Sequence, residues 1–144
     1  FSTEDYTLTT SLICGEYMNY DSVIPKVGKY DVVFDRDSLL GAATRVKNLM
    51  DLKHREPVVL HIDSESCYIT SRLTGVEFHE DVLCQGTIPE PMNIAFDDIL
   101  LLNGVSATKG EGIRALLNNS LSPMRIENEG FTALVLPVRM KNRA

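Results

Sequence analysis

Side chains that could bind a metal or attack a substrate are few in this sequence, and their spacing indicates no catalytic chemistry. The three histidines, His54, His61 and His79, include no pair with the spacing of a metal site. The sequence also contains no GxSxG, GxGxxG, P-loop or HExxH motif. The acidic cluster within residues 77–81 is more typical of a solvated strand edge than of a catalytic carboxylate pair. We therefore expect a protein that is not an enzyme and that needs neither a metal nor another cofactor.

The cysteines bear on the compartment in which the chain works. Cys14, Cys67 and Cys84 are odd in number, widely spaced and without a CxxC pair, a pattern that predicts reduced thiols in a cytoplasm. No apolar run reaches the roughly 18 residues of a membrane-spanning helix. The first ten residues are polar and acidic, unlike a signal peptide. They also lack an initiator Met, so we expect a processed product or a fragment.

Length and charge limit the partners that the chain could bind. Its 144 residues suit one domain with a sizeable core. A hydrophobic share of 44% and a charged share of 24% are ordinary for a globular protein. The formal net charge of −6 repels nucleic acid on average. Any association with DNA must therefore depend on a local basic face or on geometry.

A pattern that occurs twice indicates how the chain is organised. An apolar run ends in the pair Phe-Asp at 34–35, and a helical pattern with Leu-Leu at 39–40 follows. Both pairs recur 62 positions later, at 96–97 and 101–102. A hairpin pattern follows each copy, first VVLHI-DSES-CYITSRL and then IRALL-NNSLS-PMRIE. Either these matches are coincidental, or one domain is built from two similar strand–helix–hairpin halves.

Each half is expected to contain one helix. The first begins near Asp35 or Asp37, since either carboxylate could cap free backbone N–H groups, and it ends by Asp51. The second covers roughly residues 97–108, before Gly110. Residues spaced four, three and four apart share one helical face. The expected buried face of the first helix is Leu39, Ala43, Val46 and Met50.

The remaining elements are expected to be strands. A strand at 5–13 has no neighbour with which to form a hairpin, so it either joins the later sheet or completes another domain. His61 and His79 are expected on solvent-facing strand positions. The other expected strands cover residues 58–62, 67–73, 76–84, 113–117, 123–127 and 131–140.

The last of these strands admits two interpretations. It is apolar from Ala133 to Val138. Pro137 favours a sheet edge or a strand end, because proline cannot donate to the ladder. On pattern alone a buried terminal strand is the simpler interpretation. The alternative is a hydrophobic ledge that receives an extended peptide.

Three stretches, taken together, resemble the C-terminal part of the bacterial sliding clamp, the β subunit of DNA polymerase III. The family's connection between its second and third domains is similar to GEYMNYDSVIPK (15–26), although Met18 stands where the family usually has proline. Its second helix and the hairpin after it resemble IAFDDILLLNGVSAT (94–108) and SLSPMRIE (120–127). Its closing segment resembles LVLPVRM (134–140), beyond which KNRA extends past the usual end.

The resemblance implies an α+β DNA-clamp fold of two strand–helix–hairpin halves, with two helices packed on antiparallel sheets. It implies that residues 1–22 are the last strand and linker of a preceding middle domain. Residues 23–144 would then form the third, C-terminal domain. The internal two-fold repeat of the family's domains accounts for the 62-residue period.

The resemblance also implies a processivity factor, which is not a catalyst. Two three-domain subunits form a homodimeric ring around duplex DNA, with helices lining the hole. The DNA-facing cations would be Arg45, Lys47 and Lys53. The ring closes between the third domain of one subunit and the first domain of the other, where Leu49 and Met50 match an apolar pair.

Polymerase and clamp-loader subunits of this family insert a Gln-Leu-x-Leu-Phe-like peptide into a groove between the middle and third domains. Such a protein would lie in the bacterial cytoplasm with the nucleoid. A second hypothesis is a small β-rich peptide-binding module unrelated to replication, which uses its terminal strand for β-augmentation. The positions that match the family's groove are Met18, Val23, Leu134, Leu136, Pro137, Val138, Arg139 and Met140.

Overall fold

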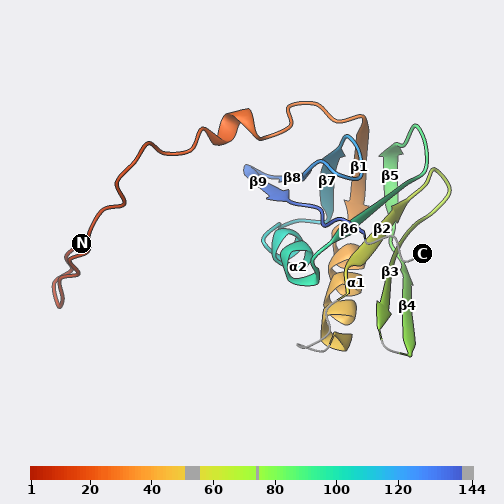
Figure 1. Cartoon of the computed structure of the whole chain (residues 1–144), viewed down its shortest axis with the longest axis horizontal. Helices are drawn as coiled ribbons and strands as arrows, with labels where there is room; N and C mark the ends of the chain where they lie inside the picture. The colour runs from red at the N-terminus through yellow and green to blue at the C-terminus, as the bar shows by residue number, and fades with distance from the viewer. Residues whose placement is uncertain (51–55, 74, 141–144) are drawn as a thin grey trace.

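The computed structural model describes residues 1–50, 56–73 and 75–140. From residue 30 onwards the described residues fold into two helices and two antiparallel sheets, as expected (Figure 1). Residues 1–29 lead to this body as an extended segment that contains one short 3₁₀-helix, η1 (Tyr20–Ser22). None of the described helices is long and apolar enough to cross a membrane.

The strands form two separate sheets. The five-stranded sheet has the order β5-β1-β7-β8-β9, and the four-stranded sheet has the order β4-β3-β2-β6. Every pair of neighbouring strands is antiparallel. The strands are β1 (Tyr30–Asp35), β2 (Val58–Ile62), β3 (Cys67–Leu73), β4 (Val76–Asp81), β5 (Cys84–Thr87), β6 (Met92–Phe96), β7 (Gly112–Leu117), β8 (Met124–Asn128) and β9 (Phe131–Val135).

The repeated sequence pattern corresponds to a repeated structure. Each sheet takes its leading strand from one half and its hairpin from the other, because β1 pairs with β7 and β6 pairs with β2. Phe34 and Phe96 are fully buried near the ends of these leading strands. Asp35 and Asp97 then cap α1 (Arg36–Leu49) and α2 (Asp98–Ser106) by accepting backbone N–H groups. The matched positions therefore have the same roles in both halves.

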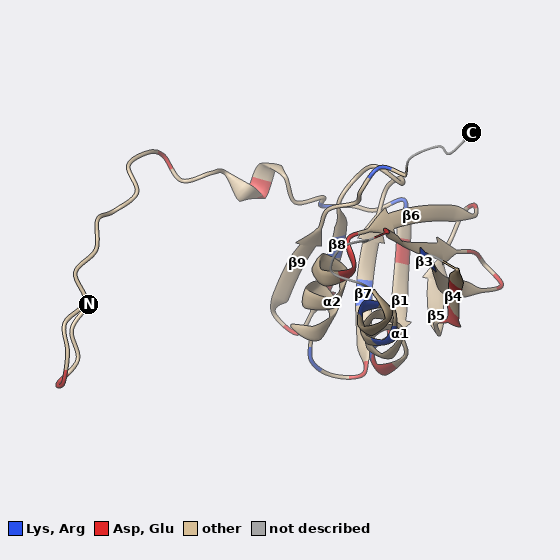
Figure 2. Cartoon of the chain, turned by 60° about the horizontal axis from the view of Figure 1, so that its bottom comes forward, with Lys and Arg blue, Asp and Glu red and all other residues tan. Residues whose placement is uncertain are grey.

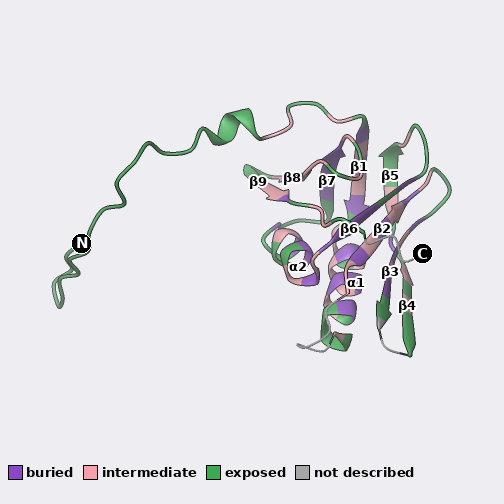
Figure 3. Cartoon of the chain, viewed as in Figure 1, coloured by how far each residue is buried: buried purple, intermediate pink, exposed green. Residues whose placement is uncertain are grey.

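The two helices lie side by side against the sheets. Asp35 accepts the N–H of Ser38 at 2.8 Å, so the first of the two expected starts is the observed one. Figure 3 shows the buried faces of helices and sheets turned toward each other. Met50 is half-buried against the core, as part of the expected helix face. The buried residues of α1 are Leu39, Ala42, Ala43 and Val46.

Three expected strands differ from the observed ones. Residues 5–13 form no strand: Thr7 makes only an isolated bridge with Ser2, and no described strand pairs with the rest of the stretch. The expected strand 76–84 is divided into β4 and β5, which belong to different sheets. The buried side chain of Val82 lies between them, where the chain changes sheet. The terminal strand β9 ends at Val135 instead of continuing to Met140.

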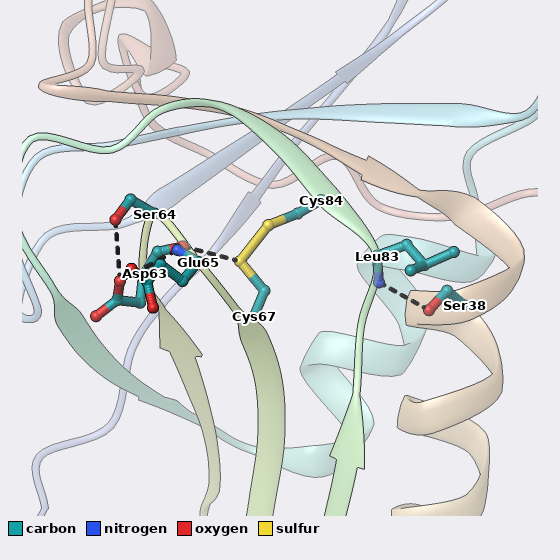
Figure 4. Close-up of a disulfide and its surroundings, with 7 residues drawn as sticks. All are labelled: Ser38, Asp63, Ser64, Glu65, Cys67, Leu83 and Cys84. Carbon is teal, nitrogen blue, oxygen red and sulfur yellow. Dashed lines mark hydrogen bonds between the residues drawn. A yellow bond between two sulfur atoms is a disulfide. The ribbon is translucent and has the colours of Figure 1, made fainter.

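The expectation that all cysteines are reduced thiols is wrong. Cys67 and Cys84 form a disulfide with a Cα–Cα distance of 6.4 Å (Figure 4). Cys14 is free and exposed. Cys67 begins β3 and Cys84 begins β5, so the bond joins the two sheets. The sequence separation of 17 residues gave no sign of this pairing, because the proximity arises only when the chain changes sheet after β4.

Candidate peptide-binding site

The terminal segment after β9 passes from one sheet to the other. Pro137 forms an isolated antiparallel bridge with Phe96, and the N–H of Val138 donates to the carbonyl of Ala95 at 2.8 Å. Regular pairing cannot continue through Pro137, since proline has no N–H. This placement agrees with the sheet edge or strand end that Pro137 favoured, although the strand was expected to run on to residue 140. The segment therefore lies across the junction of the two sheets, against β6.

Apolar side chains of this segment are only partly covered. Val135 is buried and anchors the segment, whereas Leu136 is 60% exposed. Leu134, Pro137 and Val138 are half-buried, and the last two described residues, Arg139 and Met140, are exposed. The interpretation as a fully buried terminal strand thus fails at Leu136 and Met140. A partly exposed apolar segment of this kind suits contact with an extended peptide.

The linker that precedes β1 approaches the same region. Val23 follows η1 and is 51% exposed, while Pro25 is half-buried. The guanidinium of Arg125 on β8 donates to the carbonyl of Pro25 at 2.7 Å. In the β8–β9 pairing Arg125 lies directly opposite Leu134. The linker and the terminal strand, which are distant in sequence, therefore meet at Arg125.

The structure differs from the expected site at two residues, Met18 and Arg125. Met18 is exposed in the extended segment before η1, and Figure 1 shows this segment leading away from the folded body, so the structure does not bring Met18 to the terminal strand. Arg125 was not among the candidate residues, although it occupies the junction. Its signal in the sequence is weak: a single basic residue between the core residues Met124 and Ile126 of a strand.

Of the cations expected to face DNA, Arg45 and Lys47 lie on α1, where Lys and Arg residues are sparse (Figure 2). Both Nε and Nη2 of Arg45 donate to the carboxylate of Glu80 on β4, and these hydrogen bonds raise the pKa of Arg45. Lys47 is exposed and has no acidic partner among the described residues. Lys53 lies outside the described residues. The helix α2 contains no Lys or Arg, so few cations on the helices could contact phosphate.

The two residues expected at a ring interface have different environments. Leu49 is exposed at the last position of α1, and Met50 packs partly against the core. Leu49 therefore offers more exposed apolar surface than Met50 for a contact with another chain.

His61 and His79 belong to one aromatic stack on the outer face of the four-stranded sheet. Tyr68 stacks between His61 and His79, with ring centroids 4.4 and 4.6 Å away. His79 is exposed as expected, but His61 is half-buried. Its ring nitrogens lie 2.8 Å from Asn93 Oδ1 and from Thr70 Oγ1, and burial lowers the pKa of His61.

The comparisons with known proteins agree on one family. Residues 21–139 match the family model described as DNA polymerase III beta subunit, C-terminal domain. The protein named beta sliding clamp in Synechococcus elongatus is 29% identical over 99% of this chain and 39% of that protein. The protein of the same name in Proteus mirabilis is 27% identical over 94% of this chain and 38% of that protein. The chain thus spans about two fifths of the length of these relatives.

Solved structures agree with the fold. The DNA polymerase sliding clamp from Pseudomonas aeruginosa superposes with a TM-score of 0.80 at 24% identity, over 91% of this chain and 36% of that chain. The clamp from Bacillus subtilis gives a TM-score of 0.80 at 24% identity, over 90% and 35%. With two helices, two antiparallel sheets and a family match over residues 21–139, the chain belongs to the family of the DNA polymerase III beta subunit, C-terminal domain.

Proposed function

We propose that this chain supplies the third domain of a sliding-clamp subunit, a non-catalytic processivity factor. The family match, which begins at residue 21, and the folded body, which begins at Tyr30, support a boundary near residue 22. Residues 1–22 would then belong to the middle domain, and residues 23–144 to the third. Duplex DNA and a polymerase as partners imply a location with the nucleoid in a bacterial cytoplasm.

The proposed site for partner proteins is the apolar junction of linker and terminal segment. The observation that carries it is the exposed Leu136, held between the buried Val135 and the Pro137 bridge to β6. This anchoring fixes the backbone while leaving the side chain accessible, so little ordering entropy is lost on binding. An apolar Leu-Phe pair of a Gln-Leu-x-Leu-Phe-like peptide would gain about 25 cal/mol for each Å² that it buries. The proposed contacts are Val23, Leu134, Leu136, Pro137, Val138, Arg139 and Met140, with Met18 approaching only if the extended segment folds back.

The proposed hold on DNA is topological. A chain of net charge −6 with few free cations on its helices offers little affinity for phosphate, which suits a ring that slides. Arg45, Lys47 and Lys53 remain the proposed DNA-facing residues. Leu49, with Met50 beside it, is the proposed contact for ring closure in a homodimer of full-length subunits.

The peptide site is tested with fluorescence anisotropy of a labelled Gln-Leu-Ala-Leu-Phe peptide. Leu136→Asp places a carboxylate on the apolar segment and should weaken binding at least about tenfold, or ~1.4 kcal/mol. Leu121→Asp is the matched control, because Leu121 is a similarly exposed leucine (66%) in the loop after β7, and it should bind as the wild type does. Circular dichroism checks that both variants fold.

Two results would contradict this proposal. The first is equal binding by wild type and folded Leu136→Asp, which would remove the terminal segment from the site. The second is equal binding of a scrambled peptide, which would favour the alternative of a general β-augmentation module.

A further inference from the structure

The linker is fastened to the outer face of the five-stranded sheet at several points. Leu116 alternates with the core residues Ala115 and Leu117, so its side chain faces away from the core, yet it is only 5% exposed. A Cβ at Gly28 would lie 3.1 Å from the Cβ of Leu116 and 2.7 Å from the carbonyl oxygen of Tyr30. The linker therefore lies directly on β7 at Gly28, where a side chain would not fit.

Side-chain hydrogen bonds hold the two ends of this linker. Asn118 accepts the N–H of Lys29 at 3.0 Å and donates to the carbonyl of Val27 at 3.3 Å. Arg125 holds Pro25. Among the described residues no other side chain hydrogen-bonds to residues 23–26. The stretch that contains Val23 thus depends on one side chain, Arg125, for its polar attachment.

Neighbouring side chains hold the guanidinium of Arg125 where it can bind the linker. Its side chain is only 19% exposed, and its second terminal nitrogen pairs with Glu127. Glu127 also pairs with Arg114 at 3.3 Å, and Arg114 donates to Asp31 at 2.6 and 2.8 Å. A guanidinium can bind the Pro25 carbonyl and Glu127 at once, whereas an ammonium offers no such fixed fork. Glu127 therefore orients Arg125 toward the linker.

We propose that Arg125 is a positioning residue: it fixes the linker so that Val23 and the terminal segment form one continuous surface for the partner peptide. In the row of paired residues across the sheet, Arg125 stands between Leu116, which the linker covers, and Leu134, which belongs to the proposed site. The inference rests on the proposed function, because it concerns the same peptide site.

The position of the linker is tested independently of the peptide by limited trypsin digestion. Lys26 lies next to the carbonyl that Arg125 holds, and cleavage after Lys26 requires the linker to leave the sheet. Arg125→Met should speed this cleavage at least about fivefold, since a charge-assisted hydrogen bond is lost. Arg125→Lys should restore part of the protection. Cleavage after the exposed Lys109 serves as the internal reference and should not change.

The matched control is Arg114→Met. This substitution also removes a guanidinium that lies on the same sheet face and pairs with Glu127. Arg114, however, makes no hydrogen bond to the linker. Its cleavage after Lys26 should match that of the wild type. In the peptide assay Arg125→Met should bind roughly three- to tenfold more weakly, because the site is assembled in only a fraction of the molecules. Arg114→Met should bind normally.

The outcomes separate this proposal from the function on which it rests. Cleavage after Lys26 at the same rate in wild type, Arg125→Met and Arg114→Met overturns the positioning role. Faster cleavage with unchanged peptide affinity overturns it too, because the linker would then not be part of the site. If the wild type binds no peptide, the proposed function fails, and the cleavage rates still show whether Arg125 holds the linker.

Discussion

Breaking the Cys67–Cys84 disulfide should destabilise the protein without unfolding it. The bond closes a loop with a sequence separation of 17 residues that contains all of β4. In the chain-entropy description, constraining a loop of that length in the unfolded state is worth about 3 kcal/mol. For a folded body of this size, each kcal/mol corresponds to roughly 3–6 °C in Tm. Reduction should therefore lower Tm by about 9–18 °C.

Other contacts should keep the fold intact after reduction. The N–H of Leu83 donates to Ser38 Oγ at 3.1 Å (Figure 4). The carbonyl of Leu83 accepts the N–H of Asp35 at 2.9 Å. The N–H of Val82 donates to the carbonyl of Cys67 at 2.7 Å. These bonds hold the residues before Cys84 in place, so both sheets should persist without the covalent link.

The assay is urea unfolding of the wild type with and without a dithiol reductant, beside the Cys67→Ala/Cys84→Ala variant. The reduced wild type is the cleaner sample, because it creates no cavity at the buried Cys67. Cys14→Ser is the control and should behave as the wild type does, since Cys14 is exposed and unpaired. Three reactive thiols in the unfolded, unreduced protein, or an unfolding midpoint that reductant does not change, would refute the reasoning.

Three further predictions follow from single contacts. Asp97→Ala should lower the free energy of unfolding by about 1 kcal/mol in the same urea assay, because the carboxylate accepts the N–H groups of Ile99 and Leu100 at 3.0 Å. An unchanged unfolding midpoint would show that this helix cap does not stabilise the fold. Burial holds the pKa of His61 below 6.5, so the unfolded chain takes up a proton at higher pH than the folded one, and stability should fall as pH drops through about 6.5. His61→Gln should reduce that fall in Tm, measured between about pH 8 and about pH 5.5, and an identical fall would contradict the assignment. Glu80→Gln should release Arg45 and raise the salt slope of the proposed weak duplex-DNA binding by about one, measured by anisotropy against salt concentration. An unchanged slope would remove Arg45 from the proposed DNA-facing residues.

Local signals in the sequence were sufficient for the repeat and the helices. Phe34 and Phe96 end apolar runs, and Asp35 and Asp97 are capping residues, so each helix start was recognisable from neighbouring residues alone. Pro137 likewise favoured a sheet edge or a strand end, because its missing N–H acts locally, although the expected strand 131–140 ran past it.

Features that depend on distant pairing were not recognisable. The exchange of leading strands between the halves depends on β1 meeting β7, and no residue pattern encodes that partner. The division of the expected strand 76–84 and the disulfide of Cys67 have the same cause, since both result from the change of sheet after β4. Arg125 was missed because its role depends on a carbonyl 100 residues earlier in the chain.

The most direct test of the proposed peptide site is a map of amide chemical-shift changes when the labelled protein is titrated with the Gln-Leu-Ala-Leu-Phe peptide. We expect the largest changes at Val23 and within residues 134–140, with smaller ones at Arg125, which joins the two. Changes confined to the helices or to the edge strand β4, or no changes at millimolar peptide (the ~10⁻³ M range of weak binding), would contradict it.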